Sequence, residues 1–180
     1  SEGTKIGMGW PERVDIIKWI NLILSWEPNA RIVLHGVSMG AATVLMASGE
    51  NLPGNVKAVI ADCGYTSEWD EFQREADALH IPWFPVLNAT SVLSKIRDGY
   101  DFKQASALAQ VKKSRIPTLF IHGSSDELVP YSMLGELYAA AACEKEELTV
   151  EGAGHALSSS VAPTLYWRTV EDFIAKYLDR

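Results

Sequence analysis

The spacing of apolar residues separates helices from strands along this chain. Pro11 and Glu12 suit the first turn of a helix, since proline is tolerated there and acidic groups favour the positive end of the helix dipole. This helix should end near residues 27–29. Its apolar face is marked at helical spacing by Ile16, Ile17, Ile20, Ile23 and Leu24. The same spacing predicts two later helices, one at Leu134, Leu137, Tyr138 and Ala141, and a last one at Tyr166, Val170, Phe173, Ile174 and Tyr177.

Four short apolar runs, at residues 31–35, 56–61, 116–122 and 147–150, are typical of strands buried in a sheet. The first run is followed by a helical stretch rich in small residues that continues through Ala47. Because strands that alternate with helices form parallel sheets covered on both faces, this pattern predicts an α/β fold. The length of 180 residues suits a single domain.

Residues from about 66 to 100 interrupt this alternation. They contain Trp69, Phe72, Trp83 and Phe84 together with two prolines, and they show no strand pattern. Since so long a stretch between two strands is uncommon, it predicts a small helical insertion, or lid, within the domain of residues 1–180. Two roles are equally open for the four aromatic residues, which either line an acyl or alcohol pocket or pack the insertion onto the sheet.

Composition and charge exclude several classes of partner. Hydrophobic residues make up 47% of the chain, which suits a globular protein with a sizeable core. The net charge of −7 and the lack of a dense Lys/Arg run argue against nucleic acids and anionic membranes as partners. No apolar run approaches the roughly 20 residues of a membrane helix, and no signal peptide is visible.

Cysteine use and motif content indicate neither a metal nor a cofactor. Cys63 and Cys143 are isolated and give no metal-binding pattern, so both are expected to be buried free thiols. The sequence contains no P-loop and no dinucleotide-binding fingerprint. We therefore expect a protein that works without metal and without cofactor.

One segment carries a specific sign of catalysis. The strand at residues 31–35 runs into Gly36–Gly40, which reads G-x-S-x-G, and a helix follows. A strand, a tight turn and a helix in this order are the context in which the motif presents a nucleophilic serine. Ser38 is expected in a strained turn whose neighbouring glycines leave no room for side chains. The helix N-terminus beneath Ser38 favours developing negative charge.

A serine hydroxyl needs a base to take its proton and a third group to orient that base. Asp126 lies just past the strand at 116–122, and His155 lies past the next strand. In a parallel sheet such strand ends share one edge, so both side chains can reach Ser38. Hydrolases with this motif also have their serine, acid and histidine in that chain order. The sequence therefore predicts Ser38, Asp126 and His155 as a catalytic triad.

Other polar residues are weaker candidates for these roles. Glu127 is an alternative acid, although the loop geometry favours its neighbour. Asp62 follows the second strand and is better explained as a residue that caps the strand end. His35 and His122 stand next to glycines at strand ends and are expected to be packed and hydrogen-bonded. His80 belongs to the insertion, where it either lines a pocket or faces solvent.

Three segments resemble the α/β-hydrolase superfamily, namely Gly36–Gly40, His122–Pro130 and Gly152–His155. The longer sequences around two of these segments, at residues 33–43 and 61–67, resemble those of hydrolases of Gram-positive bacteria related to the prolyl-oligopeptidase-like and Bem46-like branches. The resemblance covers residues 7–176 and implies the α/β-hydrolase fold and the triad named above. It also implies that the backbone amide of Met39 is one donor of an oxyanion hole. Members of that group often have an N-terminal signal or membrane anchor and an extracytoplasmic hydrolase domain.

The resemblance sets a further expectation for the start of the fold. In this superfamily several strands precede the nucleophile strand, and the loop after the third strand supplies the second oxyanion donor. Here a single helix precedes Ile32. We therefore expect N-terminal strands and the second donor to be missing from this chain and to be supplied by an upstream segment or a partner chain.

These features predict hydrolysis of carboxylic esters through an acyl-enzyme on Ser38. Aromatic residues and a modest lid favour small or medium apolar esters. A serine peptidase or a thioesterase of the same fold is the alternative, and a catalytically impaired fragment or a binding domain is the remaining possibility. The expected partner is a small-molecule ester or a short peptide.

Overall fold

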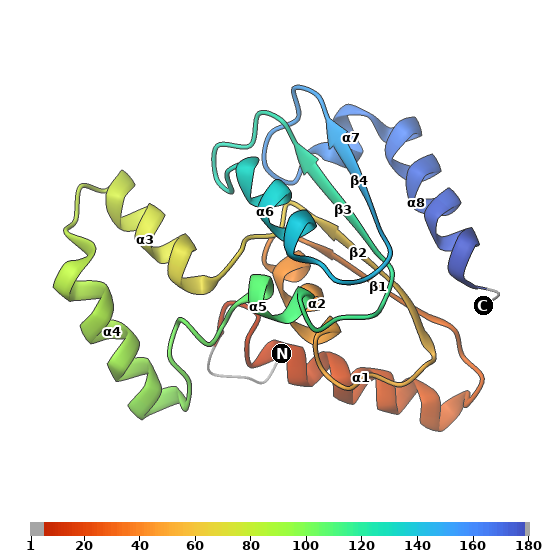
Figure 1. Ribbon diagram of the computed structural model, residues 1–180, viewed down its shortest axis with the longest axis horizontal. Coiled ribbons are helices and arrows are strands. Elements are labelled where there is room, and N and C mark those ends of the chain that lie inside the picture. Colours follow the sequence, from red (N-terminus) through yellow and green to blue (C-terminus); the bar gives the residue numbers. More distant parts are fainter. Residues whose placement is uncertain (1–5, 179–180) are drawn as a thin grey trace.

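The computed structural model describes residues 6–178 and shows one parallel sheet (Figure 1). Its strands, in spatial order, are β1 Ile32–Val37, β2 Val56–Asp62, β3 Thr118–Gly123 and β4 Lys145–Val150. Every neighbouring pair is parallel, so all of these strands end at the same edge of the sheet. Within residues 6–178, β1 pairs with β2 alone.

Helices cover both faces of this sheet (Figure 1). One face carries α1 Glu12–Trp26, α2 Met39–Ser48, α5 Ala107–Val111 and α6 Ser132–Ala140. The other face carries α8 Pro163–Leu178, which follows the short α7 Ser158–Val161. The remaining helices, α3 Glu68–Ala78 and α4 Trp83–Asp98, stand beside the sheet. The predicted α/β fold with a parallel sheet between helices is confirmed.

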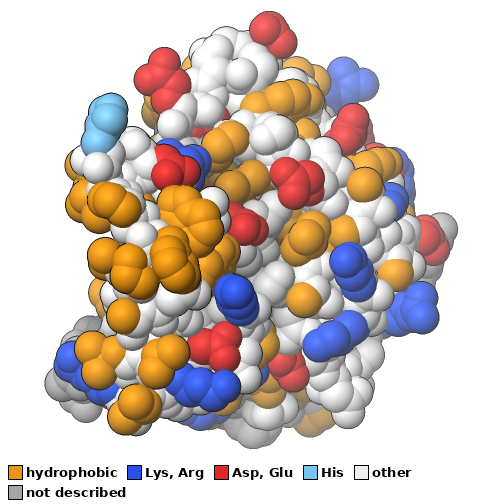
Figure 2. Space-filling view, turned by 60° about the vertical axis from the view of Figure 1, so that its left-hand side comes forward, with side chains coloured by type: hydrophobic (Ala, Val, Ile, Leu, Met, Phe, Trp, Pro, Cys, Tyr) orange, Lys and Arg blue, Asp and Glu red, His pale blue; other side chains and the backbone are white. Residues whose placement is uncertain are grey.

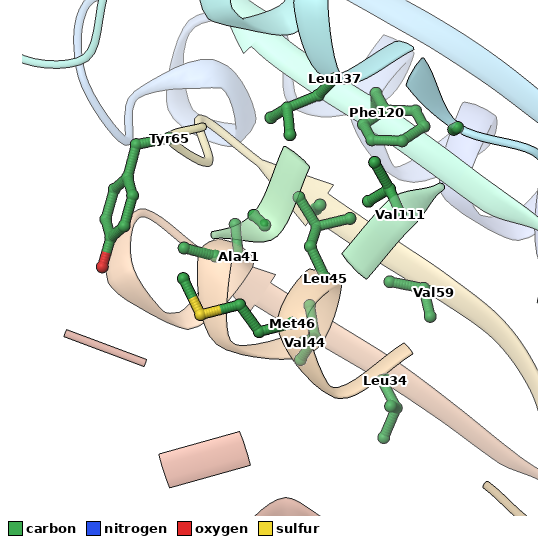
Figure 3. Packing of buried hydrophobic residues seen from close by; sticks show 14 of the residues in the cluster. Leu34, Ala41, Val44, Leu45, Met46, Val59, Tyr65, Val111, Phe120 and Leu137 are labelled. Atoms are coloured by element: carbon green, nitrogen blue, oxygen red, sulfur yellow. The ribbon is translucent and has the colours of Figure 1, made fainter. Parts of the chain in front are cut away.

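Alternating side chains of the strands divide the core into two clusters, because neighbours along a strand point to opposite faces. Val59 of β2 belongs to the cluster that includes Leu45 of α2 (Figure 3). The next residue, Ile60, belongs to the cluster under α8 that includes Phe173. Figure 3 also shows Tyr65 at the margin of the first cluster, with its hydroxyl directed away from the other side chains. Burial on both faces explains the continuous apolar runs of the central strands.

The predicted strands are present with shifted ends, and β3 begins at Thr118 rather than at residue 116. β1 continues past residue 35 because Gly36 and Val37 pair with Ala61 and Asp62 of β2. β4 begins at Lys145 rather than at residue 147, and its first residues are only partly buried. An edge strand has one flank in solvent, so polar side chains do not prevent it from pairing.

The segment expected to be an insertion contains α3 and α4. Helix α4 buries Ser91 and Ser94 and exposes Val92 and Ile96, which reverses the usual amphipathic pattern. The role of this segment as a lid stays a prediction. Throughout residues 6–178, every helix is too short or too polar to cross a membrane.

Candidate active site

Three loops at the carboxyl edge of the sheet bring the predicted site residues together. Ser38 lies between β1 and α2, Asp126 follows β3, and His155 follows β4. Ser38 Oγ lies 2.7 Å from His155 Nε2, and His155 Nδ1 lies 2.8 Å from Asp126 Oδ2. The imidazole therefore stands between a hydroxyl and a carboxylate, hydrogen-bonded to both.

Ser38 adopts a backbone conformation that residues other than glycine rarely adopt. Its φ of 56° and ψ of −122° lie outside the common regions, which costs about 1–3 kcal/mol. Its amide donates to the carbonyl oxygen of Asp62 at 2.8 Å. A Cβ at Gly36 would lie 2.2 Å from the carbonyl oxygen of Gly40, so this position excludes side chains. A Cβ at Gly40 would have no atom within 4 Å, so the expected lack of room holds only for the first glycine.

Gly36→Ala is expected to lower the reaction of Ser38 with a fluorophosphonate, whereas Gly40→Ala should preserve it. The methyl group at position 36 must push the first turn of α2 aside, which displaces Ser38 and destabilises the fold by about 1–3 kcal/mol. Labelling of the two variants and their thermal unfolding check the difference. Equal labelling of both would mean that the turn relaxes around the added methyl group.

Asp126 has hydrogen-bond partners in addition to the imidazole of His155. Its Oδ1 accepts hydrogen bonds from the backbone amides of Leu128 and Val129, each at 2.9 Å, and its side chain is fully buried. His122 Nε2 lies 3.3 Å from Asp126 Oδ2 and 3.0 Å from the carbonyl oxygen of Val129. His122 is thus packed and hydrogen-bonded, as predicted. Because both carboxylate oxygens have fixed partners, Asp126 is placed to orient His155.

The other candidate acids and histidines lie apart from this hydrogen-bond chain. Asp62 accepts a hydrogen bond from the hydroxyl of Ser158 at 3.0 Å, and burial raises the pKa of the Asp62 carboxyl. His35 Nε2 lies 3.0 Å from the hydroxyl of Tyr166, and burial lowers the pKa of this imidazole. Two further candidates are exposed, namely Glu127 and His80.

Cys63 is close to the site without being suited to chemistry there. Donor atoms of Cys63, Asp126 and His155 all lie within 4.8 Å of one another, the one such group of three that the described part of the chain contains. Burial raises the pKa of the Cys63 thiol to about 12, and a protonated thiol is a poor nucleophile and a poor metal ligand. Both cysteines are free thiols, Cys63 buried and Cys143 half-buried.

The aromatic residues predicted to line a pocket do not all meet. Phe72 and Trp83 line an apolar cavity of about 260 Å³ between α3 and α4. Trp69 instead lies under the ammonium group of Lys103, 4.4 Å from the ring centre, and Phe84 is 67% exposed. Figure 2, which brings this side of the molecule forward, shows apolar side chains gathered there. No residue of the hydrogen-bond chain described above lines the cavity.

Helix α3 contains two buried acidic residues that the sequence pattern does not predict. Glu68 and Glu71 lie in the first turn of the helix, where acidic groups are common, yet both are more than nine-tenths buried. Burial raises the pKa of Glu68 to about 8 and also raises the pKa of Glu71. The charges of Arg74 and His155 oppose this rise at Glu71 without cancelling it.

Glu68→Gln is expected to flatten the pH dependence of stability. Folded Glu68 keeps its proton up to about pH 8, while the unfolded chain releases it near 4.5. Within this window folding takes up a proton, so the free energy of unfolding falls as the pH rises. Glu68 should account for on the order of 2 kcal/mol of that fall. Urea unfolding between pH 4.5 and 8 measures this slope of the free energy of unfolding against pH. Asp77→Asn, at an exposed position of α3, is the control. Equal slopes in wild type and Glu68→Gln would contradict the prediction.

The sequence profile of the prolyl oligopeptidase family matches residues 12–180. The chain is 29% identical over 176 residues to the protein YqkD of Bacillus subtilis. The aligned region covers 97% of this chain and 58% of YqkD. It is 31% identical over 182 residues to the alpha/beta hydrolase domain-containing protein WAV2 of Arabidopsis thaliana. This aligned region covers 94% of the chain and 56% of WAV2. The chain thus spans little more than half the length of these relatives.

Solved structures share the fold at low sequence identity. The esterase Pf2001 of Pyrococcus furiosus superposes with a TM-score of 0.72 at 19% identity, covering 98% of this chain and 66% of the esterase. The acylaminoacyl peptidase of Pyrococcus horikoshii superposes with a TM-score of 0.70 at 18% identity, covering 96% of this chain and 29% of the peptidase. At this identity the likeness concerns the fold alone.

Proposed function

The chain belongs to the prolyl oligopeptidase family within the α/β-hydrolase superfamily, and from this premise we propose that it is a serine hydrolase of carboxylic esters. The observation that carries the proposal is the hydrogen-bond chain from Ser38 through His155 to Asp126. A hydroxyl, an imidazole and a buried carboxylate in this order are the groups that acyl transfer to serine uses.

In the proposed reaction Ser38 Oγ attacks the carbonyl carbon of the ester while His155 Nε2 takes the hydroxyl proton. Asp126 accepts the Nδ1–H of the imidazole and stabilises the imidazolium that forms. The imidazolium then gives its proton to the leaving alcohol, and the acyl group stays on Ser38. A water molecule deprotonated by His155 attacks this acyl-enzyme, which releases the acid and restores the serine.

The backbone amide of Met39 is the proposed first donor to the oxyanion. Met39 is the first residue of α2, and the first amides of a helix have no partner inside the helix. Sites of this kind use a second donor, which is worth about 10²–10³ in rate. We assign it to no residue of the described chain and propose that it comes from an upstream segment or a partner chain that completes the sheet beside β1.

Esters of small or medium apolar acids are the proposed substrates. The support for this class is the apolar lining of the cavity at Phe72 and Trp83, which suits an acyl chain, although the triad residues do not themselves line that cavity. The second candidate is peptide hydrolysis, which the family itself favours. A thioester substrate would use the same acyl-enzyme.

Matched substrate panels test the proposal. The protein is assayed with p-nitrophenyl esters of increasing acyl length and with aminoacyl and peptidyl p-nitroanilides. We expect kcat/KM to be highest for short and medium esters. Turnover of the anilides without turnover of the esters would replace the esterase by a peptidase. The absence of both activities, together with no fluorophosphonate adduct, would contradict any serine hydrolase.

A further inference from the structure

Asp62, the last residue of β2, is hydrogen-bonded to two of the chain segments that carry the reacting groups. Its carbonyl oxygen accepts the backbone N–H of Ser38 at 2.8 Å. Its side-chain oxygen Oδ1 accepts a hydrogen bond from the hydroxyl of Ser158 at 3.0 Å. Ser158 begins α7 and directly follows the histidine loop, residues 151–157, which carries His155. One residue of the sheet thus holds the serine turn through its backbone and the end of the histidine loop through its side chain.

Both partners of the side-chain hydrogen bond lie deep inside the protein. Asp62 is 1% exposed and Ser158 is 0% exposed. Water therefore does not compete for this hydrogen bond, and loss of one partner leaves the other buried with an unmet polar atom. The carboxylate is also hydrogen-bonded to the hydroxyl of Tyr166 in α8. Because burying a carboxylate beside neutral hydroxyls costs far more than burying an apolar side chain, this group calls for a role beyond packing.

The histidine loop is held differently on its two sides. Before His155, the carbonyl oxygen of Ala153 accepts from the amide of Ser125 at 3.0 Å, which fixes the loop to the neighbouring one after β3. After His155, the chain turns at Ala156, whose φ of 57° is a conformation that alanine rarely adopts. The hydrogen bond from Ser158 to Asp62 lies just beyond this strained turn. It therefore anchors the side of the loop on which the backbone is under strain.

The position of this loop decides whether the imidazole can work. His155 has to present Nε2 to Ser38 at 2.7 Å and Nδ1 to Asp126 at 2.8 Å at the same time. Asp126 orients the ring but does not bind the serine turn. Asp62 binds the serine turn and the end of the histidine loop, so it fixes the distance between the nucleophile and its base. A misplacement of about 1 Å between reacting groups can cost about 10²-fold in rate.

We propose that Asp62 is a positioning residue, which acts through the Ser158 hydroxyl to hold His155 in place beside Ser38. This inference rests on the proposed function, because it concerns the geometry of that same site. Asp62 itself contacts none of the reacting atoms, and the acid that binds the imidazole remains Asp126. The role of Asp62 therefore goes beyond that of a polar residue that caps a strand end.

The two hydroxyls on this carboxylate provide a matched pair of variants. Ser158→Ala removes the donor that leads to His155, whereas Tyr166→Phe removes the donor that leads to α8 and to His35. Each takes one hydroxyl from the same buried carboxylate, so both should destabilise the fold. We expect Ser158→Ala to lower kcat for p-nitrophenyl acetate about 10- to 100-fold at unchanged KM, and to slow the fluorophosphonate reaction of Ser38 by a similar factor. Tyr166→Phe should react at close to the wild-type rate.

The rate constant of the fluorophosphonate reaction separates this role from a general loss of structure. It is taken from the time course at excess probe, where unfolded protein lowers the amount of labelled protein and not the rate constant. A double-mutant cycle adds a second measurement, because Ser158→Ala should have no further effect on the rate constant in an Asp62→Ala background.

Three results would overturn the positioning role. They are an unchanged rate constant in Ser158→Ala, equal losses in Ser158→Ala and Tyr166→Phe, and an undiminished effect of Ser158→Ala in the Asp62→Ala background. If the wild-type protein itself forms no fluorophosphonate adduct and hydrolyses no ester, the proposed function fails instead.

Discussion

Replacing Ser38 by alanine is expected to lower kcat/KM for p-nitrophenyl esters by on the order of 10⁶-fold and to abolish labelling by a fluorophosphonate. The reason is chemical, since no other hydroxyl of the described chain is hydrogen-bonded to His155. The loss should appear in kcat, because the substrate can still bind. Steady-state kinetics and mass spectrometry of the labelled protein measure the two effects.

The fold of this variant should survive, which separates lost chemistry from lost structure. Ser38 has a positive φ of 56°, and alanine takes that conformation no more easily than serine does. A modest loss of stability is therefore expected, and thermal unfolding of both proteins provides the control. If a folded Ser38→Ala protein still reacts with the fluorophosphonate, the nucleophile is another residue and the proposed mechanism is wrong.

The sequence predicted the sheet well because its central strands are buried on both faces. Apolar runs such as those of β2 and β3 have few alternatives to a buried strand, and their order fixes which loops share an edge. That is why Ser38, Asp126 and His155 could be grouped without coordinates. The hydrogen-bond distances, by contrast, depend on the backbone of three separate loops.

The sequence was least informative where local pattern and tertiary contact disagree. Helices α5 and α7 have five and four residues, too few for a helical period to emerge. Helix α4 exposes apolar residues and buries serines, so its pattern does not indicate which face packs. The two roles left open for the four aromatic residues could not be separated from sequence either, since Phe72 and Trp83 line the cavity between α3 and α4 whereas Trp69 and Phe84 do not.

Glu68 and Glu71 illustrate a second limit. Their positions in the first turn of a helix are ordinary, and sequence gives no reason to expect them inside the protein. Their burial depends on residues far away in the chain, such as Tyr100 beside Glu68. A charged group is therefore recognised as unusual only after its surroundings are known, whereas the serine motif is recognisable from neighbours along the chain.

Asp126→Asn is expected to lower kcat for esters about 10⁴-fold while leaving the fold intact. The amides of Leu128 and Val129 both donate to Asp126 Oδ1, so the amide oxygen of asparagine should take that place. Its NH₂ group must then face His155 Nδ1, which can only accept from it. The proton of the neutral imidazole is thereby moved to Nε2, and the nitrogen that faces Ser38 can no longer take the hydroxyl proton.

The neighbouring acid provides the control for this prediction. Glu127 is exposed, so Glu127→Gln should keep wild-type kcat. Nitrogen NMR of the imidazole distinguishes the two tautomers of His155 directly, with Nδ1 protonated in the wild type and Nε2 protonated in Asp126→Asn. Full activity of Asp126→Asn, combined with a large loss in Glu127→Gln, would assign the acid to Glu127. An unchanged tautomer together with lost activity would mean that Asp126 acts through the charge it places beside the imidazolium rather than through the orientation of the ring.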